Sequence, residues 1–271
     1  MTAGQDRAAH EIDTTKPHPA RVYDWFLGGK DNYPVDEELA AQLLAVEPRG
    51  REIARVNRAF MHRATRWLAE SGVRQFLDIG TGIPTEPNLH QIAQGVAPDA
   101  RVVYADNDPI VLRHAEALLR STPQGVTEYV QADVRDPDTI FGLAKQVLDL
   151  DRPVALSLIA LTHFLGDDDG VYELVNTLME PLAPGSYLVL SQVTGDFDPE
   201  GAKRATALYA AGGVTLRLRS QAEVTAFHDG FELAGPGVVL GAKWRPEIGD
   251  EAAHEGDDTI PVYAGVSRKI S

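Results

Sequence analysis

The chain has 271 residues, of which 44% are hydrophobic and 24% are charged, so its composition is that of an ordinary globular protein. Its formal net charge of −15 and its lack of any run of five basic residues argue against surfaces for nucleic acid or anionic membranes, because Lys and Arg drive such binding. The absence of cysteine excludes disulfides, thiolate catalysis and Cys-based zinc sites.

Residues 1–19 are polar, contain prolines at positions 17 and 19, and are expected to form a flexible leader. The first twenty residues lack the apolar segment of a signal peptide. No apolar run approaches the roughly 18 residues that a membrane helix needs. We therefore expect a cytoplasmic protein with no membrane partner.

Helical spacing follows over residues 35–71, with Pro48 and Gly50 separating two predicted helices. The apolar stripes that carry this prediction are Leu39, Leu43 and Leu44 in the first helix, and Ile53, Val56, Phe60, Ala64 and Trp67 in the second. We expect residues 20–72 to form a helical N-terminal extension.

From residue 73 onward, short apolar runs alternate with segments of helical length. The runs are VRQFLDIG, ARVVYADND, VTEYVQADVRD, RPVALSLIAL and GSYLVLSQV, and the predicted helices lie near 86–96, 109–120, 137–149 and 168–182. Strands that alternate with helices indicate a parallel sheet with crossover helices.

The end of the chain has a different pattern. Helices are predicted near 199–211 and within SQAEVTAFHDG, and two strand-like runs, FELAGPGVVL and IPVYAGVSRK, flank a Gly-, Pro- and acid-rich insertion over 244–258. Two late strands without a crossover helix favour an antiparallel hairpin at one sheet edge. Residues 73–271 are thus expected to form a single α/β core.

The segment FLDIGTGIPT, residues 76–85, is the most specific motif in the sequence. A predicted strand leads into Asp78, Gly80 and Gly82, and glycines let the backbone turn tightly beside a ligand. A dinucleotide-binding G-x-G-x-x-G would need glycine where Thr85 stands. The carboxylate of Asp78 favours a cationic ligand, such as the amino group of a methionine moiety beside a sulfonium.

Acidic residues also follow the next two strands. Asp106 ends the second strand, where it can accept hydrogen bonds from ribose hydroxyls, and Asn107 and Asp108 directly after it are candidates to flank ribose or adenine. Asp133 and Val134 end the third strand, where the acid can accept from an adenine amine while the valine covers the ring. Helix capping and turn formation are the alternative roles for these acids.

Together these motifs resemble a class I S-adenosylmethionine-dependent methyltransferase. The ordered set ARVYDWFLGGKDNY, NRAF, FLDIGTGIPT, VVYADNDP, QADVRDP, LAPGSYLVLS and WRP resembles an uncharacterised bacterial family labelled S-adenosyl methyltransferase, from about residue 19 to the end of the chain. The resemblance implies a Rossmann-like, mostly parallel sheet of seven strands with an antiparallel edge strand and helices on both faces.

The resemblance also implies S-adenosylmethionine as the cofactor and roles for particular residues. It places Asp78, Gly80, Thr81 and Gly82 around the methionine end of the cofactor, Asp106 at the ribose and Asp133 at the adenine.

His163, in the segment LIALTHFLGDDDG after the fourth strand, falls where the transferred methyl group is expected and is the candidate general base. It is alternatively a buried structural residue or a cover for the cofactor. A metal pair with Asp167 lacks a third ligand, so no metal is expected. Because the fourth strand lacks the acidic or Asn-Pro-Pro signature of amine-methylating enzymes, the expected acceptor is a small molecule.

The segment RVYDWFLGGKDNYPVD, residues 21–36, is predicted to cover the cofactor site as a lid. Its aromatics Tyr23, Trp25, Phe26 and Tyr33 would give apolar cover, Gly28 and Gly29 a close turn, and Lys30, Asp31 and Asn32 polar contacts, with support from Asn57 and Arg58 on the following helix. The alternative is a surface turn whose aromatics fasten the helices to the sheet.

Three functions remain open at this point. The leading hypothesis is a methyltransferase that acts on a small molecule. The second is a nucleotide-binding oxidoreductase, against which the missing third glycine and Asp78 argue. The third is a catalytically idle module that binds S-adenosylmethionine or S-adenosylhomocysteine.

Overall fold

A single mixed sheet forms the centre of the molecule in the computed structural model, which describes residues 13–111, 120–249 and 254–271. The strands are β1 (Gln75–Ile79), β2 (Arg101–Asp106), β3 (Val126–Gln131), β4 (Ala155–Ile159), β5 (Tyr187–Val193), β6 (Glu232–Leu233), β7 (Val239–Leu240) and β8 (Val262–Arg268). Their order is β3-β2-β1-β4-β5-β8-β6, and β7 also pairs with β8. Strands β1 to β5 run parallel, which confirms the predicted crossover topology.

The reversed strand of the sheet is β8, which pairs antiparallel with β5 and with the short strands β6 and β7. A mostly parallel sheet with an antiparallel strand toward one edge is therefore confirmed. The sheet has eight strands and not the expected seven, because FELAGPGVVL is not one strand. Pro236 has no N–H to donate and Gly237 has a φ of 90°, so the run breaks into β6 and β7.

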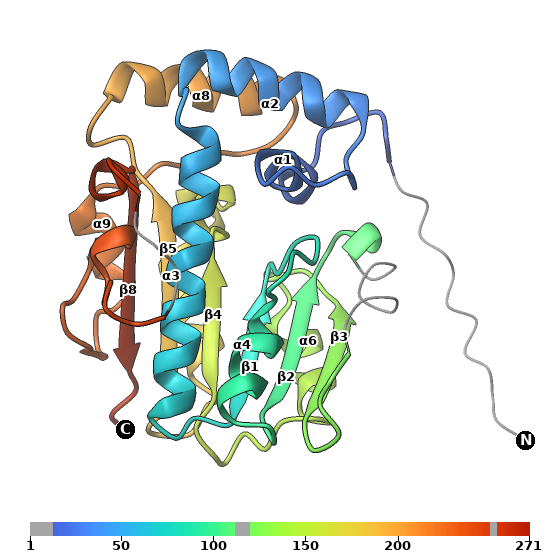
Figure 1. The fold of residues 1–271 in the computed structure, drawn as a ribbon, viewed down its shortest axis with the longest axis vertical. Helices are drawn as coiled ribbons and strands as arrows, with labels where there is room; N and C mark the ends of the chain where they lie inside the picture. Colours follow the sequence, from blue (N-terminus) through green and yellow to red (C-terminus); the bar gives the residue numbers. More distant parts are fainter. Residues whose placement is uncertain (1–12, 112–119, 250–253) are drawn as a thin grey trace, which may run out of the picture.

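Both faces of the sheet are covered by helices (Figure 1). The helices are α1 (Pro19–Phe26), α2 (Pro34–Val46), α3 (Gly50–Glu70), α4 (Leu89–Val96), α6 (Pro137–Ala144), α7 (Val171–Met179), α8 (Pro199–Ala211) and α9 (Gln221–Ala226). On β1, Phe76 faces a cluster with residues of α3 and α4, while Leu77 faces a cluster with residues of α6, α7 and α9. Strands buried on both faces explain the continuous apolar runs in the sequence.

The predicted helices correspond closely to the observed ones. The segments 86–96, 137–149 and 168–182 contain α4, α6 and α7, and the helix near 199–211 is α8. The segment 109–120 begins as a helix, and most of it lies outside the described residues. No helix in the described ranges is long and apolar enough to cross a bilayer.

Helices α1, α2 and α8 lie beyond the carboxyl ends of the parallel strands (Figure 1). Their contact surface is an apolar cluster that includes Val22 of α1, Leu39 and Leu43 of α2, and Tyr209 of α8. Pro34 occupies the first turn of α2, and Glu47 ends that helix three residues before α3 begins, as Pro48 and Gly50 predicted. These three helices form a roof over the edge at which ligands bind in open α/β sheets.

Candidate functional site

The turn after β1 brings the backbone close to two neighbouring strands. Gly80 and Gly82 have φ angles of 71° and 67°, in the left-handed region that glycine adopts without strain. The Gly80 N–H donates to the carbonyl of Ala105 at 2.8 Å, and a Cβ at Gly80 would lie 2.6 Å from Cδ1 of Leu161. The chain reaches α4 at Leu89 only after this open loop.

A large pocket opens above this loop, with a volume of about 1570 Å³ when its mouth is included. We call it the Gly-loop pocket. Its walls come from α1, α3, the ends of β1 to β4 and residues 213–215. The structure brings together here these residues that the sequence predicted for a site: Tyr23, Asn57, Arg58, Asp78, Gly80, Thr81, Gly82, Asp106, Asn107 and Val134.

Asp78 is a buried carboxyl in the wall of the Gly-loop pocket. Burial raises the pKa of Asp78 to about 7, although a hydrogen bond from Thr81 and the positive charge of Arg58 act in the opposite direction. Arg58 itself donates to the carbonyls of Thr85 and Pro87 and so fastens the Gly loop to α3. A buried carboxyl with a raised pKa favours a cationic ligand, because the positive charge stabilises the ionised carboxylate.

Asp106 lies beneath the same loop and is 6% exposed. Its Oδ2 accepts from the Gly82 N–H at 2.8 Å and its Oδ1 from the Asp108 N–H at 2.9 Å. Asn107 lines the pocket and donates to Oδ2 of Asp133 at 3.0 Å. Asp133 does not line the pocket, although its neighbours Ala132 and Val134 do, and its contact with adenine stays a prediction.

Asp108, also predicted to contact the cofactor, does not line the Gly-loop pocket. Its Oδ1 caps the following helix by accepting from the Ile110 N–H at 2.9 Å. Its Oδ2 lies 3.1 Å from Nδ1 of His18 and 3.6 Å from Nε of Arg21. Asp108 therefore joins the sheet to the N-terminal helix, and no local sequence pattern identifies His18 or Arg21 as its partners.

Helix α1 and the residue before it contribute His18, Pro19, Ala20 and Tyr23 to the wall of the Gly-loop pocket. Pro19 occupies its first turn, and Nδ1 of His18 accepts from the Ala20 N–H at 3.3 Å. The glycine pair of the predicted lid segment ends the helix, because Gly28 has a φ of 80°. The half of this segment that lies over the pocket is therefore the helical half.

The other half, residues 28–33, folds around one carboxylate and does not line the Gly-loop pocket. Oδ2 of Asp24 accepts from the Asp31 N–H at 2.9 Å and from Nδ2 of Asn32 at 2.8 Å. Lys30 is exposed, and Tyr33 packs near Ile83, Ile110 and Val111. Lys30, Asp31, Asn32 and Tyr33 thus lie outside the wall of the Gly-loop pocket, and their contact with a ligand stays a prediction.

The tight fit of this loop gives a testable consequence. A Cβ at Gly29 would lie 2.0 Å from Oδ1 of Asp24, so Gly29→Ala must displace the carboxylate that holds the loop. We expect a loss of about 1–3 kcal/mol of stability, the usual cost of overpacking, measured as a lower thermal midpoint. Lys30→Ala, at the exposed neighbour, should leave the midpoint unchanged. Equal midpoints for the two variants would contradict this description of the loop.

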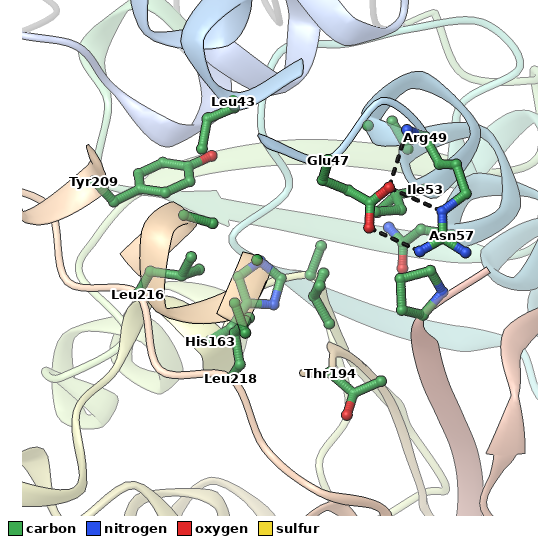
Figure 2. A pocket seen from close by; sticks show the side chains of 18 of the residues that line it. Leu43, Glu47, Arg49, Ile53, Asn57, His163, Thr194, Tyr209, Leu216 and Leu218 are labelled. Carbon is green, nitrogen blue, oxygen red and sulfur yellow. Dashed lines mark hydrogen bonds and ion pairs between the residues drawn. The ribbon is translucent and has the colours of Figure 1, made fainter. Parts of the chain in front are cut away.

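A second pocket lies beside the first and is enclosed mainly by apolar side chains; we call it the apolar pocket. Its volume is about 1010 Å³ with its mouth, and it lies under α2 and α8. His163 lines it and does not line the Gly-loop pocket. Figure 2 shows His163 with Leu43, Tyr209 and Leu216 on one side and the Glu47–Arg49 ion pair on the other.

The two pockets meet at the carboxyl end of β4. They share Pro19, Tyr23, Asn57, Ala160 and Phe164. The backbone of Ala160 has a φ of 53°, which is strained for a residue with a Cβ and is typical of functional sites. Residue type alone does not predict a left-handed backbone conformation at an alanine.

Buried hydrogen bonds hold this junction in place. The Ala160 N–H donates to Oγ of Ser191 at 2.9 Å, and that hydroxyl donates to Oδ1 of Asn57 at 2.5 Å. Nδ2 of Asn57 donates to the Tyr23 hydroxyl at 2.9 Å, and Tyr23 donates to the Ala54 carbonyl at 3.0 Å. These hydrogen bonds connect β4 and β5 to α1, so Tyr23 and Asn57 are held in place where the two pockets meet.

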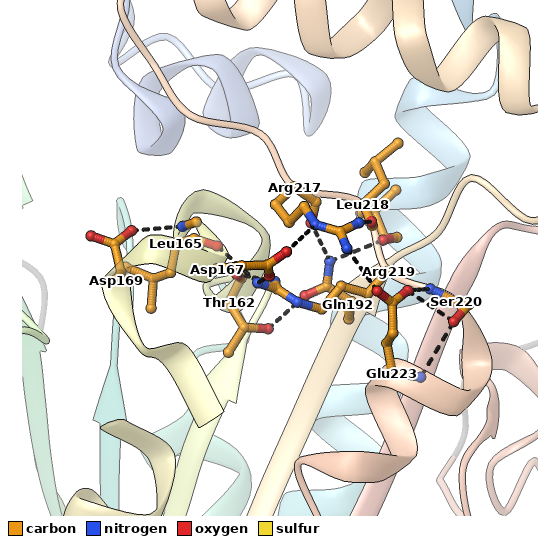
Figure 3. Close-up of polar contacts among 12 residues, drawn as sticks. Thr162, Leu165, Asp167, Asp169, Gln192, Arg217, Leu218, Arg219, Ser220 and Glu223 are labelled. Atoms are coloured by element: carbon orange, nitrogen blue, oxygen red, sulfur yellow. Dashed lines mark hydrogen bonds and ion pairs between the residues drawn. The ribbon is translucent and has the colours of Figure 1, made fainter. Parts of the chain in front are cut away.

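The loop after β4, which carries His163, is anchored by a buried arginine (Figure 3). Arg219 is fully buried and donates to the carbonyls of Thr162 at 2.7 Å and Leu165 at 3.0 Å, and to Oδ1 of Asp167 at 2.9 Å. The acids 167–169 form a short 3-10 turn, and α7 begins only at Val171. Sequence reasoning did not identify Arg219, because its role depends on contacts across more than fifty positions.

Comparisons with known proteins agree on one family. The family model described as S-adenosyl methyltransferase matches residues 5–270. The chain belongs to this family. A solved structure of a DUF574 family protein from Streptomyces avermitilis MA-4680 is 49% identical, with a TM-score of 0.91 over 96% of this chain and 100% of that one. A structure described as a methyltransferase from Thermobifida fusca YX is 38% identical, with a TM-score of 0.86 over 98% and 100%.

More distant structures share the fold alone. The plantazolicin methyltransferase BamL, solved with S-adenosylhomocysteine, is 11% identical, with a TM-score of 0.52 over 93% of this chain and 96% of that one. No curated protein matches the chain. The predicted class I methyltransferase fold and family membership are thus confirmed.

S-adenosylmethionine is the cofactor of this S-adenosyl methyltransferase family, and the residues of the Gly-loop pocket fit it. The wall holds the buried carboxyl of Asp78, which suits an amino cation. Asp106 and Asn107 supply hydrogen-bonding groups. Ala132 and Val134 give apolar surface that suits an aromatic base. The pocket thus offers charged, polar and apolar groups, as the cofactor requires.

Proposed function

We propose that this protein transfers a methyl group from S-adenosylmethionine to a small molecule. The observation that carries the proposal is the junction of the two pockets at Ala160, Tyr23 and Asn57. A ligand in the Gly-loop pocket meets a ligand in the apolar pocket there, under a common roof of helices. Alignment of two reactants in this way is worth roughly 7–11 kcal/mol of the barrier.

The residues of the Gly-loop pocket hold the donor in this proposal. Asp78 binds the amino cation, Asp106 and Asn107 bind the ribose, and Val134 covers the adenine. Bound S-adenosylmethionine supplies a methyl group on a positively charged sulfur. Tyr23, Pro19 and Ala20 of α1 exclude water from the pocket mouth, which protects the transfer from competing solvent.

The ionisation of Asp78 predicts how cofactor binding depends on pH. The free carboxyl has a pKa of about 7 and must lose its proton to bind an amino cation, which stays charged below its own pKa of roughly 7.7–8.0. Affinity for S-adenosylmethionine should therefore fall as the pH decreases below 7, approaching about tenfold per pH unit. Calorimetry between pH 5.5 and 7.5 measures this slope.

The matched variant for that experiment is Asp78→Asn, which keeps the shape and removes the ionisation. It should bind more weakly at pH 7.5 and show a flat pH profile between 5.5 and 7.5. An unchanged slope in Asp78→Asn would mean that another group titrates, and the assignment of Asp78 to the amino cation would be wrong.

The activity itself is tested by turnover. The protein is incubated with methyl-labelled S-adenosylmethionine and a library of small molecules, and both labelled product and S-adenosylhomocysteine are measured. Acceptor-dependent formation of both supports the proposed function. Binding of the cofactor with no transfer to any library member, in repeated screens that include cell extract, would favour an idle cofactor-binding module instead.

A further inference from the structure

The apolar pocket is closed on most sides by hydrocarbon. Its walls include Phe26 of α1, Leu43 of α2, Ile53 of α3, and Leu216 and Leu218 of the segment after α8. At its edge, Phe197 is 52% exposed although it is a large hydrophobic side chain. An exposed phenylalanine at the edge of an apolar pocket is typical of a ligand-binding surface.

The charged side chains in the wall of this pocket already have hydrogen-bond or ion-pair partners within the protein. Arg49 donates to both carboxylate oxygens of Glu47, each at 2.8 Å, and its Nη1 donates to the Thr259 carbonyl at 3.3 Å. Oδ1 of Asp198 accepts from the Gly201 N–H at 2.9 Å, at the start of α8. A charged ligand group would therefore lose its hydration here without gaining a free counter-ion from these side chains.

His163 differs from those residues, because it is polar and unsatisfied. It is 4% exposed, and its Nδ1 is buried without a hydrogen-bond partner among the residues that the structure describes. Burial, with Arg219 beside it, lowers the pKa of His163 to about 3, so the ring is neutral at physiological pH. A neutral imidazole has one donor and one acceptor nitrogen. Unsatisfied buried polar groups are rare and call for a partner.

We propose that the apolar pocket binds the methyl acceptor, and that this acceptor is an uncharged, largely apolar molecule whose hydroxyl or amine hydrogen-bonds to His163. The inference rests on the proposed function for the identity of the neighbouring ligand. Phe164, which follows His163 directly, lines both pockets, so the hydrogen-bonded end of such a molecule lies at the side of the pocket where the methyl donor binds. His163 then fixes the orientation of the acceptor.

Two fluorescent probes with one ring skeleton test the chemical class. N-phenyl-1-naphthylamine is neutral and carries an N–H, whereas 1-anilinonaphthalene-8-sulfonate adds a single negative charge. Titration of the full chain should give a dissociation constant for the neutral probe at least tenfold lower than for the sulfonate. Equal or tighter binding of the sulfonate would overturn the proposal of an uncharged ligand.

A pair of variants on α8 locates the binding site. Ala205 lines the apolar pocket and is partly buried, whereas Ala207 is exposed and outside it. Ala205→Trp fills the pocket and should weaken binding of N-phenyl-1-naphthylamine at least tenfold. Ala207→Trp adds the same side chain to the outer face and should change binding less than twofold. Equal binding by both variants would place the probe elsewhere and contradict the proposal.

His163→Phe tests the polar contact at nearly constant shape. The variant should bind N-phenyl-1-naphthylamine severalfold more weakly than the wild type does. Its binding of 1-phenylnaphthalene, which has no N–H, should stay within twofold of the wild type. Equal losses for both probes would mean that His163 only fills space.

Calorimetry with S-adenosylhomocysteine separates this inference from the proposed function. Ala205→Trp should bind S-adenosylhomocysteine within twofold of the wild type, because Ala205 lies outside the Gly-loop pocket. If the wild type fails to bind S-adenosylhomocysteine, the proposed function fails. If it binds S-adenosylhomocysteine but not the neutral probe, only the acceptor inference fails.

Discussion

Replacement of Asp106 by alanine should weaken binding of S-adenosylmethionine by tenfold or more. The carboxylate is buried at the end of β2 and holds the N–H groups of Gly82 and Asp108. Its loss removes one charge-assisted hydrogen bond to the ribose, worth roughly 1.5–3 kcal/mol, and releases the Gly loop at the same time. Isothermal titration calorimetry at pH 7.5 measures the change, which corresponds to roughly ten- to a hundredfold.

The comparison for Asp106→Ala is Asp138→Ala, the same substitution at an exposed position in the first turn of α6. That variant should bind the cofactor as the wild type does. A folded Asp106→Ala protein, judged by its circular dichroism, with unchanged affinity would show that the end of β2 does not hold the ligand.

The largest loss of stability is expected for Arg219→Ala. The guanidinium is fully buried, satisfies the carbonyls of Thr162 and Leu165, and lies 5.4 Å from the Phe227 ring. Its partner Asp167 is 53% exposed and can be solvated again, so the ion pair itself contributes little. Two unsatisfied buried carbonyls and the lost packing should together cost about 2–4 kcal/mol.

Arg217→Ala is the matched control, since Arg217 also pairs with Asp167 and lies only two positions away. Arg217 is 38% exposed, and its contacts with Asp167 and Glu223 are surface contacts. Its removal should cost no more than about 1 kcal/mol. Thermal denaturation of both variants measures the difference. A control as unstable as Arg219→Ala would show that burial of the guanidinium is not what holds the loop after β4.

Local sequence patterns predicted the sheet and the Gly loop well. Each depends on neighbouring residues: strands buried on both faces read as apolar runs, and Gly80 and Gly82 occupy a turn that few other residues can adopt. The acids after successive strands could also be found, because the carboxyl ends of parallel strands meet at one edge. For Asp106 this placed the residue in the pocket wall.

Several predicted site residues make contacts that local sequence patterns did not reveal. Lys30 and its neighbours looked like ligand contacts, but the local loop folds around Asp24, a partner that composition does not reveal. Asp108 turns toward Arg21 because the N-terminal helix returns to the sheet. His163 lies in the apolar pocket, whose walls come from α2, α8 and the segment after it, and its expected place near the transferred methyl group stays a prediction.

The most direct test of the cofactor site is a calorimetric titration of S-adenosylhomocysteine into the wild-type protein at pH 7.5. Asp106→Ala and Ala205→Trp are titrated in the same way. The Gly-loop pocket predicts saturable binding at a single site, a loss of tenfold or more in the first variant, and an affinity within twofold of the wild type in the second. Absence of saturable binding to the wild-type protein, or equal binding by Asp106→Ala, would contradict the assignment of this pocket to the cofactor.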